Sequence, residues 1–503
     1  MTRVTEPSTL LCDFYKLSHK DQYPTGTEVI YSTFIPRSNK YFPQADKVVV
    51  FGIQSFVKKY FIDHFKVNFF DRPKNDVISE YVRFVRYTLG IQEPDTSHIE
   101  ELHDLGYLPI RLKALKEGTL APIKVPVLTI ENTRPELASS FWITNYLETL
   151  ISNEIWLPMT SATMSYQYRK LLNKYALDTV GHTDDVGFQG HDFSMRGMSS
   201  LAASKASGAG HLLSFTGTDT IPAILFHEEY YNANIETELV GASIPATEHS
   251  VMSANTDADS RDEYAMYKRL ITEVYPNGIF SVVSDTYDFW AVIGDILPRL
   301  KKEIMERDGK VVIRPDSGDP VLILTGDPNA KTELERKGLI EALWDVFGGT
   351  VSDKGYKVLD SHIGAIYGDS ITLERAEQIV EKLKQKGFAS TNVVFGIGSY
   401  TFQYATRDSL GFAMKATYAV VNGQERLLFK DPKTDDGTKR SLRGRVVVSK
   451  NNTGEIVAVD GLNKKDEESH TQNNLLEDVF VNGELVRDES LKQIRDRVFS
   501  SLS

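Results

Sequence analysis

An arginine and two aspartates follow directly after an apolar run in the second half of the chain. The segment IRPDSGDP, residues 313–320, places Arg314, Asp316 and Asp319 on a turn that is rich in proline and glycine. A turn requires the proline, serine and glycine, but it does not require a cation and a carboxylate in fixed order. A guanidinium binds phosphate oxygens, and a carboxylate accepts hydrogen bonds from sugar hydroxyls. We therefore expect Arg314 and Asp316 to face a ligand.

Six further turns between residues 185 and 400 have the same character. Each follows a strand-like run, and the expected strands end near Phe193, Phe215, Ile244, Ser284, Ile313, Ile366 and Ile397. In chain order the turns read HDFSMR, TGTDT, PATEHS, SDTYD, RPDSGDP, YGDS and GIGSY. Loops are polar in general, which accounts for their Asp, Ser and Gly residues. It accounts less well for Arg196, His249 and Arg314 in one set.

Helix-like segments separate most of these strands, for example AMYKRLITEVY and TLERAEQIVEKLKQKG. Strand–helix alternation of this length predicts βαβ units and parallel strands. In a barrel of parallel strands, the turns that follow the strands converge at one rim, where such folds keep their active sites. We therefore predict a single site built from these seven turns.

The chain of 503 residues is too long for one ordinary core, so more than one domain is expected. Two long helical segments, PELASSFWITNYLETLISNEIWL and ATMSYQYRKLLNKYALD, follow a mixed beginning, and the first is expected to open at Pro135. Antiparallel strands are expected after about residue 400. We predict that residues 1–150 form the N-terminal part of an α/β domain and residues 151–400 a barrel-like catalytic domain. Residues 401–503 are expected to return to the first domain.

Composition excludes several classes of protein. The single cysteine, Cys12, allows no intrachain disulfide and no cysteine metal cluster, which suits a reducing compartment. The sequence lacks a signal peptide and any run of about 18 apolar residues, so we expect a cytoplasmic protein without membrane contact. A formal charge of −12 argues against nucleic-acid binding. Residues 401–450 nevertheless hold ten Lys/Arg against five Asp/Glu, which indicates either a local anion site or a solvated basic face.

Familiar catalytic motifs such as GxxxxGK[ST], GxGxxG, GxSxG and HExxH are missing from the sequence. Carboxylates dominate the turns instead, namely Asp219, Glu248, Asp285, Asp316 and Asp369. A set of this kind can hold Mg²⁺, bind sugar hydroxyls and favour a positively charged transition state, although the sequence leaves the metal ligands unspecified. Six cations can neutralise phosphate oxygens, namely Arg196, Arg314, Arg407, Lys415, Lys430 and Lys439. Three glycines let backbone N–H groups approach a phosphate, namely Gly368, Gly396 and Gly398. The combination predicts a phosphorylated sugar as ligand.

Ten short motifs, in order between Leu11 and Arg440, make the sequence similar to a known family. They are CDFYKLSH, FGIQ, HDFSMRGMSS, GTDT, PATEHS, VVSDTYD, IRPDSGDP, YGD, TRD and FKDP. With these motifs the chain resembles the nicotinamide phosphoribosyltransferases. The resemblance implies transfer of phosphoribose from phosphoribosyl pyrophosphate to nicotinamide. It also implies a type II phosphoribosyltransferase fold, with an irregular (β/α) barrel domain, a second α/β domain built from the N- and C-terminal parts, and a homodimer with shared active sites.

The resemblance also implies roles for residues. Phe193 would stack on one face of the nicotinamide ring and Tyr15 of the partner subunit on the other, while Asp219 would accept a hydrogen bond from the carboxamide. The other substrate-binding residues implied by the motifs are Arg196, Arg314, Asp316, Gly368, Asp369, Gly398, Ser399, Arg407 and Lys415, with Arg407 and Lys415 from the partner subunit. The phosphate loop departs from the family pattern, because GIGSY has Ser399 and Tyr400 where a longer glycine run is usual. The N–H group of Ser399 can still donate.

In the family, a histidine at the place of His249 is phosphorylated by ATP, and the phosphoenzyme couples ATP hydrolysis to product formation. An imidazole is a suitable phosphoryl acceptor. Glu248 and Asp285 would orient or polarise it, and Lys430 and Lys439 would meet the nucleotide phosphates. ATP is therefore expected as a co-substrate together with Mg²⁺.

The expected chemistry needs no general base, because the pyridine nitrogen that attacks the anomeric carbon carries no proton. Carboxylates near the ribose would favour its oxocarbenium character, and cations would neutralise the departing pyrophosphate. Three alternatives remain: a nicotinate phosphoribosyltransferase, a non-catalytic nucleotide-binding relative, and an unrelated barrel enzyme such as a sugar-phosphate aldolase. Asp219 argues against the first and the intact set of site residues against the second. The third would require a Schiff-base lysine or a metal cluster, and none of the turns carries an obvious one.

Overall fold

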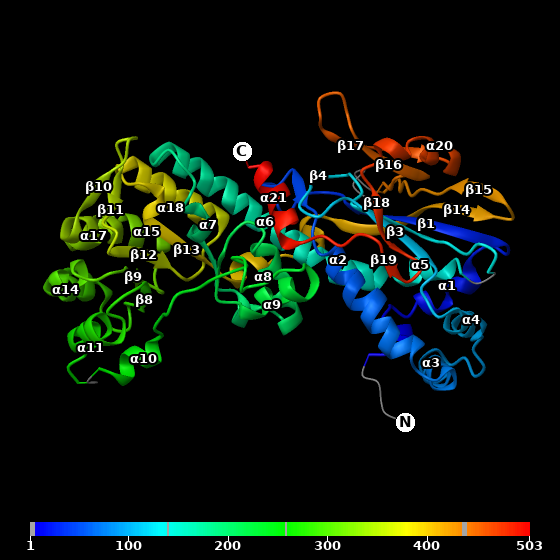
Figure 1. Ribbon diagram of the computed structural model, residues 1–503, viewed down its shortest axis with the longest axis horizontal. Helices are drawn as coiled ribbons and strands as arrows, with labels where there is room; N and C mark the ends of the chain where they lie inside the picture. Colours follow the sequence, from blue (N-terminus) through cyan, green and yellow to red (C-terminus); the bar gives the residue numbers. More distant parts are fainter. Residues whose placement is uncertain (1–5, 138–139, 257–258, 435–439, 503) are drawn as a thin grey trace. The chain divides into compact units, whose positions relative to one another are not determined.

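The structure is a computed structural model of the chain, and it describes residues 6–137, 140–256, 259–434 and 440–502. The chain divides into two compact units (Figure 1). The sheet unit comprises Met1–Thr163, Phe226–Ala233 and Ala405–Ser503, and the barrel unit comprises Met164–Leu225 and Asn234–Tyr404.

The sheet unit contains a seven-stranded antiparallel sheet in the order β15-β14-β1-β5-β3-β18-β19. Its strands are β1 (Thr27–Pro36), β3 (Ile110–Ala114), β5 (Leu128–Asn132), β14 (Phe412–Val421), β15 (Gln424–Leu427), β18 (Glu477–Val481) and β19 (Glu484–Leu485). Two strands from the end of the chain pair with strands from its beginning, β14 with β1 and β18 with β3. This pairing confirms that the N- and C-terminal parts build one α/β domain.

Helices and two small two-stranded sheets complete the sheet unit. The helices are α1 (Lys16–Gln22), α2 (Ile53–Phe56), α3 (Lys74–Leu89), α4 (Ser97–Leu105), α5 (Trp142–Tyr146), α20 (Lys464–Ser469) and α21 (Leu491–Ser500). The small sheets pair β2 (Lys47–Val49) with β4 (Leu120–Pro122) and β16 (Arg445–Lys450) with β17 (Ile456–Leu462). Alternation along β1 and β14 places Phe34 against Phe412, with stacked rings 5.4 Å apart, in a continuous apolar core.

The expected helix start at Pro135 is wrong. Residues 135–137 form a turn that is closed by the N–H group of Leu137 and the hydroxyl of Ser140, both donating to the carbonyl of Arg134. These local hydrogen bonds compete with a helix. The first helix of this segment is α5, which begins only at Trp142. The two expected helical segments then merge, because α6 runs without interruption over Glu148–Thr179.

The barrel unit is built on a six-stranded parallel sheet in the order β7-β6-β13-β12-β9-β8. Its strands are β6 (Gly190–Asp192), β7 (Gly217–Thr218), β8 (Phe280–Val283), β9 (Val311–Arg314), β12 (Ile363–Tyr367) and β13 (Val393–Ile397). The segment 242–247 closes the circle, because Ala242 bridges to Gly217 at one sheet edge and Ala246 to Ser281 at the other. Seven extended segments therefore follow one another around the barrel in chain order. This agrees with the barrel of parallel strands predicted from the sequence.

Most helices of the barrel unit lie between its strands, as βαβ connections require, while α7 (Val186–Gln189) precedes the first strand and α19 (Ser399–Phe402) follows the last. The helices between the strands are α8 (Leu201–His211), α10 (His249–Ala254), α11 (Tyr264–Arg269), α12 (Phe289–Ala291), α13 (Leu297–Arg299), α14 (Lys301–Met305), α15 (Pro320–Thr325), α16 (Glu333–Lys337), α17 (Leu339–Phe347) and α18 (Leu373–Gln385). A small sheet of β10 (Gly349–Val351) and β11 (Lys357–Leu359) is added outside the barrel strands. Helix α9 (Ile221–Tyr230), like α6, contributes residues to both units.

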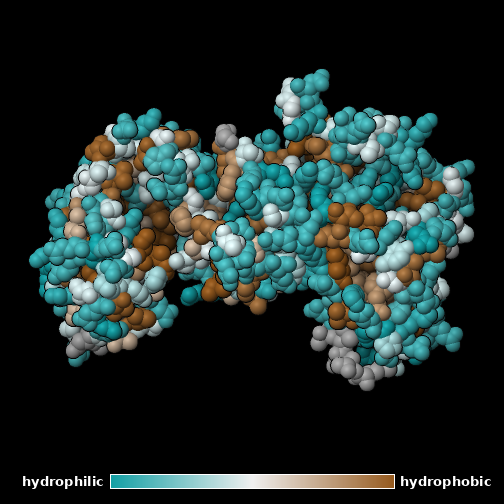
Figure 2. All heavy atoms as spheres, viewed as in Figure 1, coloured by the Kyte–Doolittle hydropathy of each residue, from teal (hydrophilic) through white to brown (hydrophobic). Residues whose placement is uncertain are grey.

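The visible surface of both units is mostly polar, with hydrophobic side chains gathered in separate patches (Figure 2). None of the helices in the described part of the chain is both long enough and apolar enough to cross a membrane.

Candidate active site

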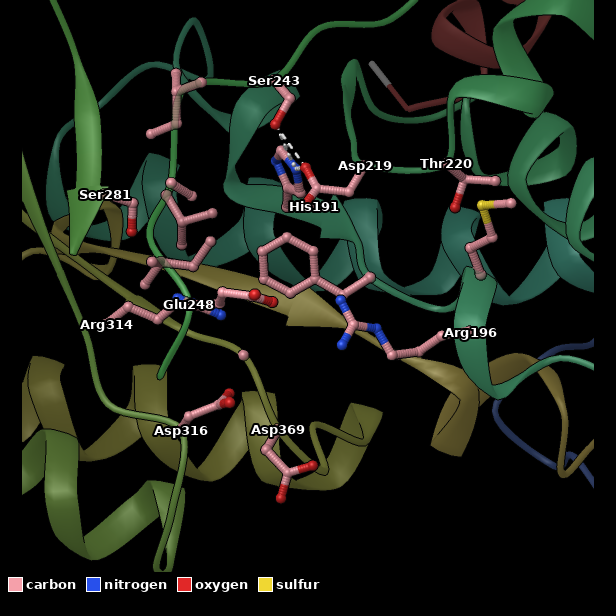
Figure 3. A pocket seen from close by; sticks show the side chains of 18 of the residues that line it. His191, Arg196, Asp219, Thr220, Ser243, Glu248, Ser281, Arg314, Asp316 and Asp369 are labelled. Carbon is pink, nitrogen blue, oxygen red and sulfur yellow. Dashed lines mark hydrogen bonds and ion pairs between the residues drawn. The ribbon is translucent and has the colours of Figure 1, made fainter. Parts of the chain in front are cut away.

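A cavity of about 1410 Å³ lies in the barrel unit and is lined by residues of the barrel strands and of the segments next to them, including the turns that follow the strands. The expected site residues that line it are Phe193, Arg196, Asp219, Glu248, His249, Arg314, Asp316, Gly368, Asp369, Gly398 and Ser399. In Figure 3, Asp219 lies with His191 and Ser243 on one side of the cavity, and Asp316 lies with Asp369 on the opposite side. The chain thus brings together residues that are spread over more than two hundred positions.

A hydrogen-bonded group fixes Asp219 at the end of β7. The Nε2–H group of His191 donates to Oδ1 of Asp219 over 2.7 Å, and the hydroxyl of Ser243 donates to the same oxygen over 2.5 Å. Burial raises the pKa of Asp219, but hydrogen bonds from His191 and Ser243 and the charges of His191 and Arg314 outweigh it, so the pKa lies below the ordinary value. Asp219 therefore remains a carboxylate in the cavity.

Phe193 lies directly after β6 and packs against two glycines, Gly396 on β13 and Gly368 directly after β12. Its N–H group donates to the carbonyl of Ile397 over 3.0 Å, and its ring centre lies 4.8 Å from that of His191. A Cβ atom at Gly396 would lie 2.4 Å from the Phe193 ring, and one at Gly368 would lie 3.5 Å from it. Glycine at 396 thus makes room for an aromatic ring, a use that differs from the phosphate contact expected for it.

The segment IRPDSGDP divides its polar residues between two tasks. At the end of β9, Arg314 donates from Nη2 to the carbonyl of Thr247 over 2.6 Å, and Asp316 lines the cavity. Asp319 instead caps α15, where its Oδ1 accepts from the N–H groups of Val321 and Leu322. The second carboxylate of the motif therefore begins a helix.

Asp285 lies behind the cavity wall and ties the Asp316 turn to β8. Its Oδ2 accepts from the N–H group of Asp316 over 3.0 Å and from the hydroxyl of Ser317 over 2.6 Å. The side chain is only 6 % exposed. Asp285 thus acts on the turn that carries Asp316, and it does not itself line the cavity.

His249 begins α10 and is held at one nitrogen. Its Nδ1 shares a hydrogen bond of 3.1 Å with the hydroxyl of Thr286. Its Nε2 lies 3.8 Å from Oδ1 of Asp285 and 4.0 Å from Oδ2 of Asp316. The imidazole is half exposed, so Nε2 is the nitrogen left to face a ligand among carboxylates.

Three residues that shape these contacts, His191, Ser243 and Thr286, were not singled out from the sequence. All three lie within or close to the polar turns, and His191 even belongs to HDFSMR. The alternation of side chains along a strand gives no sign that His191 turns toward Asp219, because their contact depends on the pairing of β6 with β7. Only the three-dimensional arrangement identifies them.

The residues expected from the partner subunit belong to the sheet unit. Tyr15 precedes α1 and is 55 % exposed. Lys415 on β14 lies 3.3 Å from Glu148, whose other carboxylate oxygen accepts from Lys16 over 2.5 Å. Arg407 and Lys430 are exposed on the same unit, and Lys439 lies outside the described residues. Tyr15 and Lys415 are therefore linked through Lys16 and Glu148 on one unit.

Magnesium fits the cavity only if the substrate contributes ligands. Among the residues described by the structure, no cluster of three or more His, Cys, Asp or Glu side chains could hold a metal ion. Mg²⁺ is commonly bound by one or two carboxylates together with substrate phosphates. Asp316 and Asp369, which both line the cavity, are carboxylates suited to that arrangement.

The fold and the ring of polar turns define a phosphoribosyltransferase. The chain matches the model of the nicotinate phosphoribosyltransferase (NAPRTase) family over residues 188–484 and that of the nicotinamide phosphoribosyltransferase N-terminal domain over residues 8–87. Two solved structures share the type II fold over nearly the whole chain. They are nicotinate-nucleotide pyrophosphorylase from Pyrococcus furiosus (TM-score 0.56, 16% identity, 100% and 98% of the two chains) and human nicotinic acid phosphoribosyltransferase (0.54, 17%, 98% and 93%).

Curated relatives narrow the class further. The chain is 47% identical to a nicotinamide phosphoribosyltransferase of Acinetobacter baylyi, over 97% of this chain and 96% of the relative. It is 37% identical to one of Mycoplasma pneumoniae, over 87% and 94% of the two chains. The chain belongs to the nicotinamide phosphoribosyltransferases and is a pentosyltransferase of NAD salvage.

Proposed function

We propose that the enzyme transfers the phosphoribosyl group of phosphoribosyl pyrophosphate to nicotinamide and forms nicotinamide mononucleotide and pyrophosphate. The observation that carries this proposal is the carboxylate of Asp219, fixed in the cavity by His191 and Ser243. A carboxylate accepts a hydrogen bond from a carboxamide NH₂ group but repels the carboxylate of nicotinate. Phe193, beside His191, supplies an aromatic face for the pyridine ring.

The opposite side of the cavity suits the sugar and its phosphates. Asp316 and Asp369 would accept hydrogen bonds from ribose hydroxyls and hold Mg²⁺, which when bound neutralises charge on the pyrophosphate. Further contacts to the phosphates are assigned to Arg196, Arg314, Gly368, Gly398 and Ser399. The carboxylates favour positive charge at the anomeric carbon, where the pyridine nitrogen attacks as the bond to pyrophosphate breaks.

His249 is assigned as the acceptor of the γ-phosphoryl group of ATP. Because Nδ1 is engaged by Thr286, Nε2 would attack the γ-phosphorus, the bond to the β-phosphate oxygen would break, and ADP would leave. Asp285 and Asp316, about 4 Å from Nε2, and Glu248 beside it would stabilise the cationic phosphoimidazole. Lys430 and Lys439 are assigned to the nucleotide phosphates.

The active enzyme is proposed to be a cytoplasmic homodimer with shared sites. Tyr15 of the partner subunit would cover the second face of nicotinamide, and Arg407 and Lys415 of the partner subunit would meet the 5′-phosphate. The exposed ring of Tyr15 and its link to Lys415 through Lys16 and Glu148 support a common surface. The free thiol of Cys12 fits a reducing compartment.

A paired assay tests the proposal. Purified enzyme with Mg²⁺ and phosphoribosyl pyrophosphate is given nicotinamide or nicotinate, each with and without ATP. We expect much higher kcat/KM for nicotinamide, and ATP should lower its apparent KM in wild type but not in His249→Ala. Equal use of both bases would favour a nicotinate phosphoribosyltransferase, and ligand binding without turnover would favour a non-catalytic relative.

A further inference from the structure

The turn that carries Asp316 is held from two sides. On the side of β8, Oδ2 of Asp285 accepts from the N–H group of Asp316 and from the hydroxyl of Ser317. On the side of β12, the hydroxyl of Tyr367 donates to the carbonyls of Ser317 over 2.9 Å and Gly318 over 3.0 Å. A tyrosine has one hydroxyl hydrogen, so the two carbonyls share it. Tyr367 itself does not line the cavity, so its effect on the reaction must pass through this turn.

The two residues after Tyr367 bring the end of β12 to the same carboxylate. Strands β9 and β12 are parallel neighbours, so the turns that follow them lie side by side. A Cβ atom at Gly368 would lie 2.9 Å from Oδ1 of Asp316, which means that the carboxylate packs directly against the glycine. Asp369 comes next, and it lines the cavity on the same side as Asp316 (Figure 3). Three consecutive residues therefore hold the turn, make room for its carboxylate and supply a second one.

The hydroxyl of Tyr367 contributes position rather than packing. The side chain is fully buried, and a phenylalanine ring would fill the same space. Ser317 and Gly318 are exposed, so water can satisfy their carbonyls without the tyrosine. Burial, followed by the charges of Asp369 and Asp285, raises the pKa of Tyr367, so the hydroxyl keeps its hydrogen. The hydroxyl is thus a fixed donor that ties an exposed turn to a buried strand.

We propose that Tyr367 is a positioning residue for the phosphoribosyl side of the reaction, because its hydroxyl holds Asp316 in a set place beside Asp369. The inference rests on the proposed function, which assigns these two carboxylates to the ribose hydroxyls and Mg²⁺. A displacement of about 1 Å in such a group can cost about 100-fold in rate. Without the hydroxyl, Asp285 still holds the turn, so the turn stays folded but loses its link to β12. Binding of phosphoribosyl pyrophosphate should weaken, while nicotinamide, placed at Asp219, keeps its contacts.

Tyr367→Phe removes the hydroxyl and keeps the ring. We expect KM for phosphoribosyl pyrophosphate to rise about 5–10-fold, the size of one hydrogen bond between neutral groups, and KM for nicotinamide to stay within about twofold. Tyr175→Phe is the matched control, because Tyr175 is buried in the same unit, donates to Glu381 over 2.8 Å and does not line the cavity. It also loses one hydroxyl contact, yet both KM values should match wild type. Thermal unfolding shows that each variant is folded.

A change on the other side of the turn tests the same idea. Ser317→Ala removes the hydroxyl that donates to Asp285, so it should also raise KM for phosphoribosyl pyrophosphate and spare KM for nicotinamide. The double variant with Tyr367→Phe and Ser317→Ala loses a contact on both sides, and we expect it to be impaired more than either single variant. A double variant with the KM of wild type would overturn the proposal.

Calorimetry separates this inference from the proposed function. Phosphoribosyl pyrophosphate with Mg²⁺ is titrated into each variant without nicotinamide, and we expect Kd to rise about 5–10-fold in Tyr367→Phe and to stay unchanged in Tyr175→Phe. Wild-type Kd and KM in folded Tyr367→Phe, an equal rise in KM for both substrates, or an equal loss in Tyr175→Phe would each remove the role of Tyr367 and leave the proposed function intact. A wild-type enzyme that binds no phosphoribosyl pyrophosphate would remove the proposed function, and this inference with it.

Discussion

His191 donates its Nε2–H group to Oδ1 of Asp219 over 2.7 Å. Because a carboxylate has no hydrogen to donate, the contact requires a proton on Nε2 of His191. The Asp219 side chain stays 48 % exposed, so the carboxylate is fixed in orientation and still accessible to a ligand. The preference for nicotinamide over nicotinate can therefore be tested by changing Asp219 or His191.

Replacing Asp219 should remove the preference for nicotinamide. In Asp219→Ser, the ratio of kcat/KM for nicotinamide to that for nicotinate is expected to fall by about 10–100-fold, the value of a hydrogen bond to a charged group. The exposed acid Asp353 offers a control, because it does not line the cavity, and Asp353→Ser should keep the ratio. Steady-state kinetics with both bases measures it. An unchanged ratio in folded Asp219→Ser would contradict the assignment.

The partners of Asp219 should set the acid side of the pH profile. Burial raises the pKa of Asp219, but the hydrogen bonds from His191 and Ser243 hold it below its ordinary value, so the carboxylate persists as the pH falls past that value. Removing a partner in Ser243→Ala or His191→Ala raises this pKa. We therefore expect the acid limb of kcat/KM for nicotinamide to move to higher pH in both variants. An acid limb at the wild-type position would show that these hydrogen bonds do not tune Asp219.

The convergence of the turns could be predicted because it follows from parallel strands alone. Polar residues after successive strands meet at one rim whatever the details of packing, which is why the sequence could predict that Asp219, His249 and Asp316 lie around one cavity. The closing segment 242–247 was also placed correctly as a strand-like run ending near Ile244. This segment joins the two edges of the sheet only through isolated bridges to Gly217 and Ser281. Such bridges depend on contacts between distant parts of the chain, so the local sequence pattern could not predict them.

Other features were missed where local hydrogen bonds or tertiary contacts decide the outcome. Pro135 suits a first helical position, but the turn around the carbonyl of Arg134 prevents the helix there. Asp319 has the same side chain as Asp316 and lies three residues away, yet it caps α15.

The close contact between Gly396 and Phe193 predicts a specific loss. In Gly396→Ala the new Cβ would overlap the Phe193 ring, at 2.4 Å, so the ring must move. Overpacking of this kind costs about 1–3 kcal/mol, and we expect KM for nicotinamide to rise about tenfold. At Gly398 a Cβ would meet no described atom within 4 Å. Gly398→Ala should therefore leave KM for nicotinamide unchanged, and the opposite pattern would contradict stacking on Phe193.

Sharing of sites between subunits predicts complementation. Tyr15→Ala and Asp219→Ala homodimers should both be weakly active. A heterodimer of the two contains one site with Asp219 and the partner's Tyr15 intact and one site that lacks both, so we expect about half of wild-type activity. Differently tagged subunits allow the heterodimer to be purified and assayed. No rescue in a confirmed heterodimer would indicate that Tyr15 acts within its own subunit.

Glu117 predicts a pH-dependent change in stability that is unrelated to catalysis. It is buried in the sheet unit and accepts from the N–H groups of Gly52 over 3.1 Å and Gln54 over 2.6 Å. Burial raises its pKa to about 7, against the hydrogen bond from Gln54 and with the charge of Glu489 adding to the rise. Between the ordinary value of 4.5 and this raised value, the folded state binds more protons than the unfolded chain. The free energy of unfolding therefore falls as the pH rises through this window.

Glu117→Gln cannot titrate, so it should remove this part of the decline. Between about pH 5 and about pH 8, the drop in unfolding free energy should be smaller than in wild type by roughly 2–3 kcal/mol. Comparing the drop rather than the absolute stability avoids confusion with the hydrogen bond that glutamine cannot accept. Urea unfolding at several pH values measures it, and Glu93→Gln, at an exposed position, should follow wild type. Parallel curves for wild type and Glu117→Gln would mean that Glu117 is already ionised in the folded protein at pH 5, with its two backbone hydrogen bonds outweighing its burial.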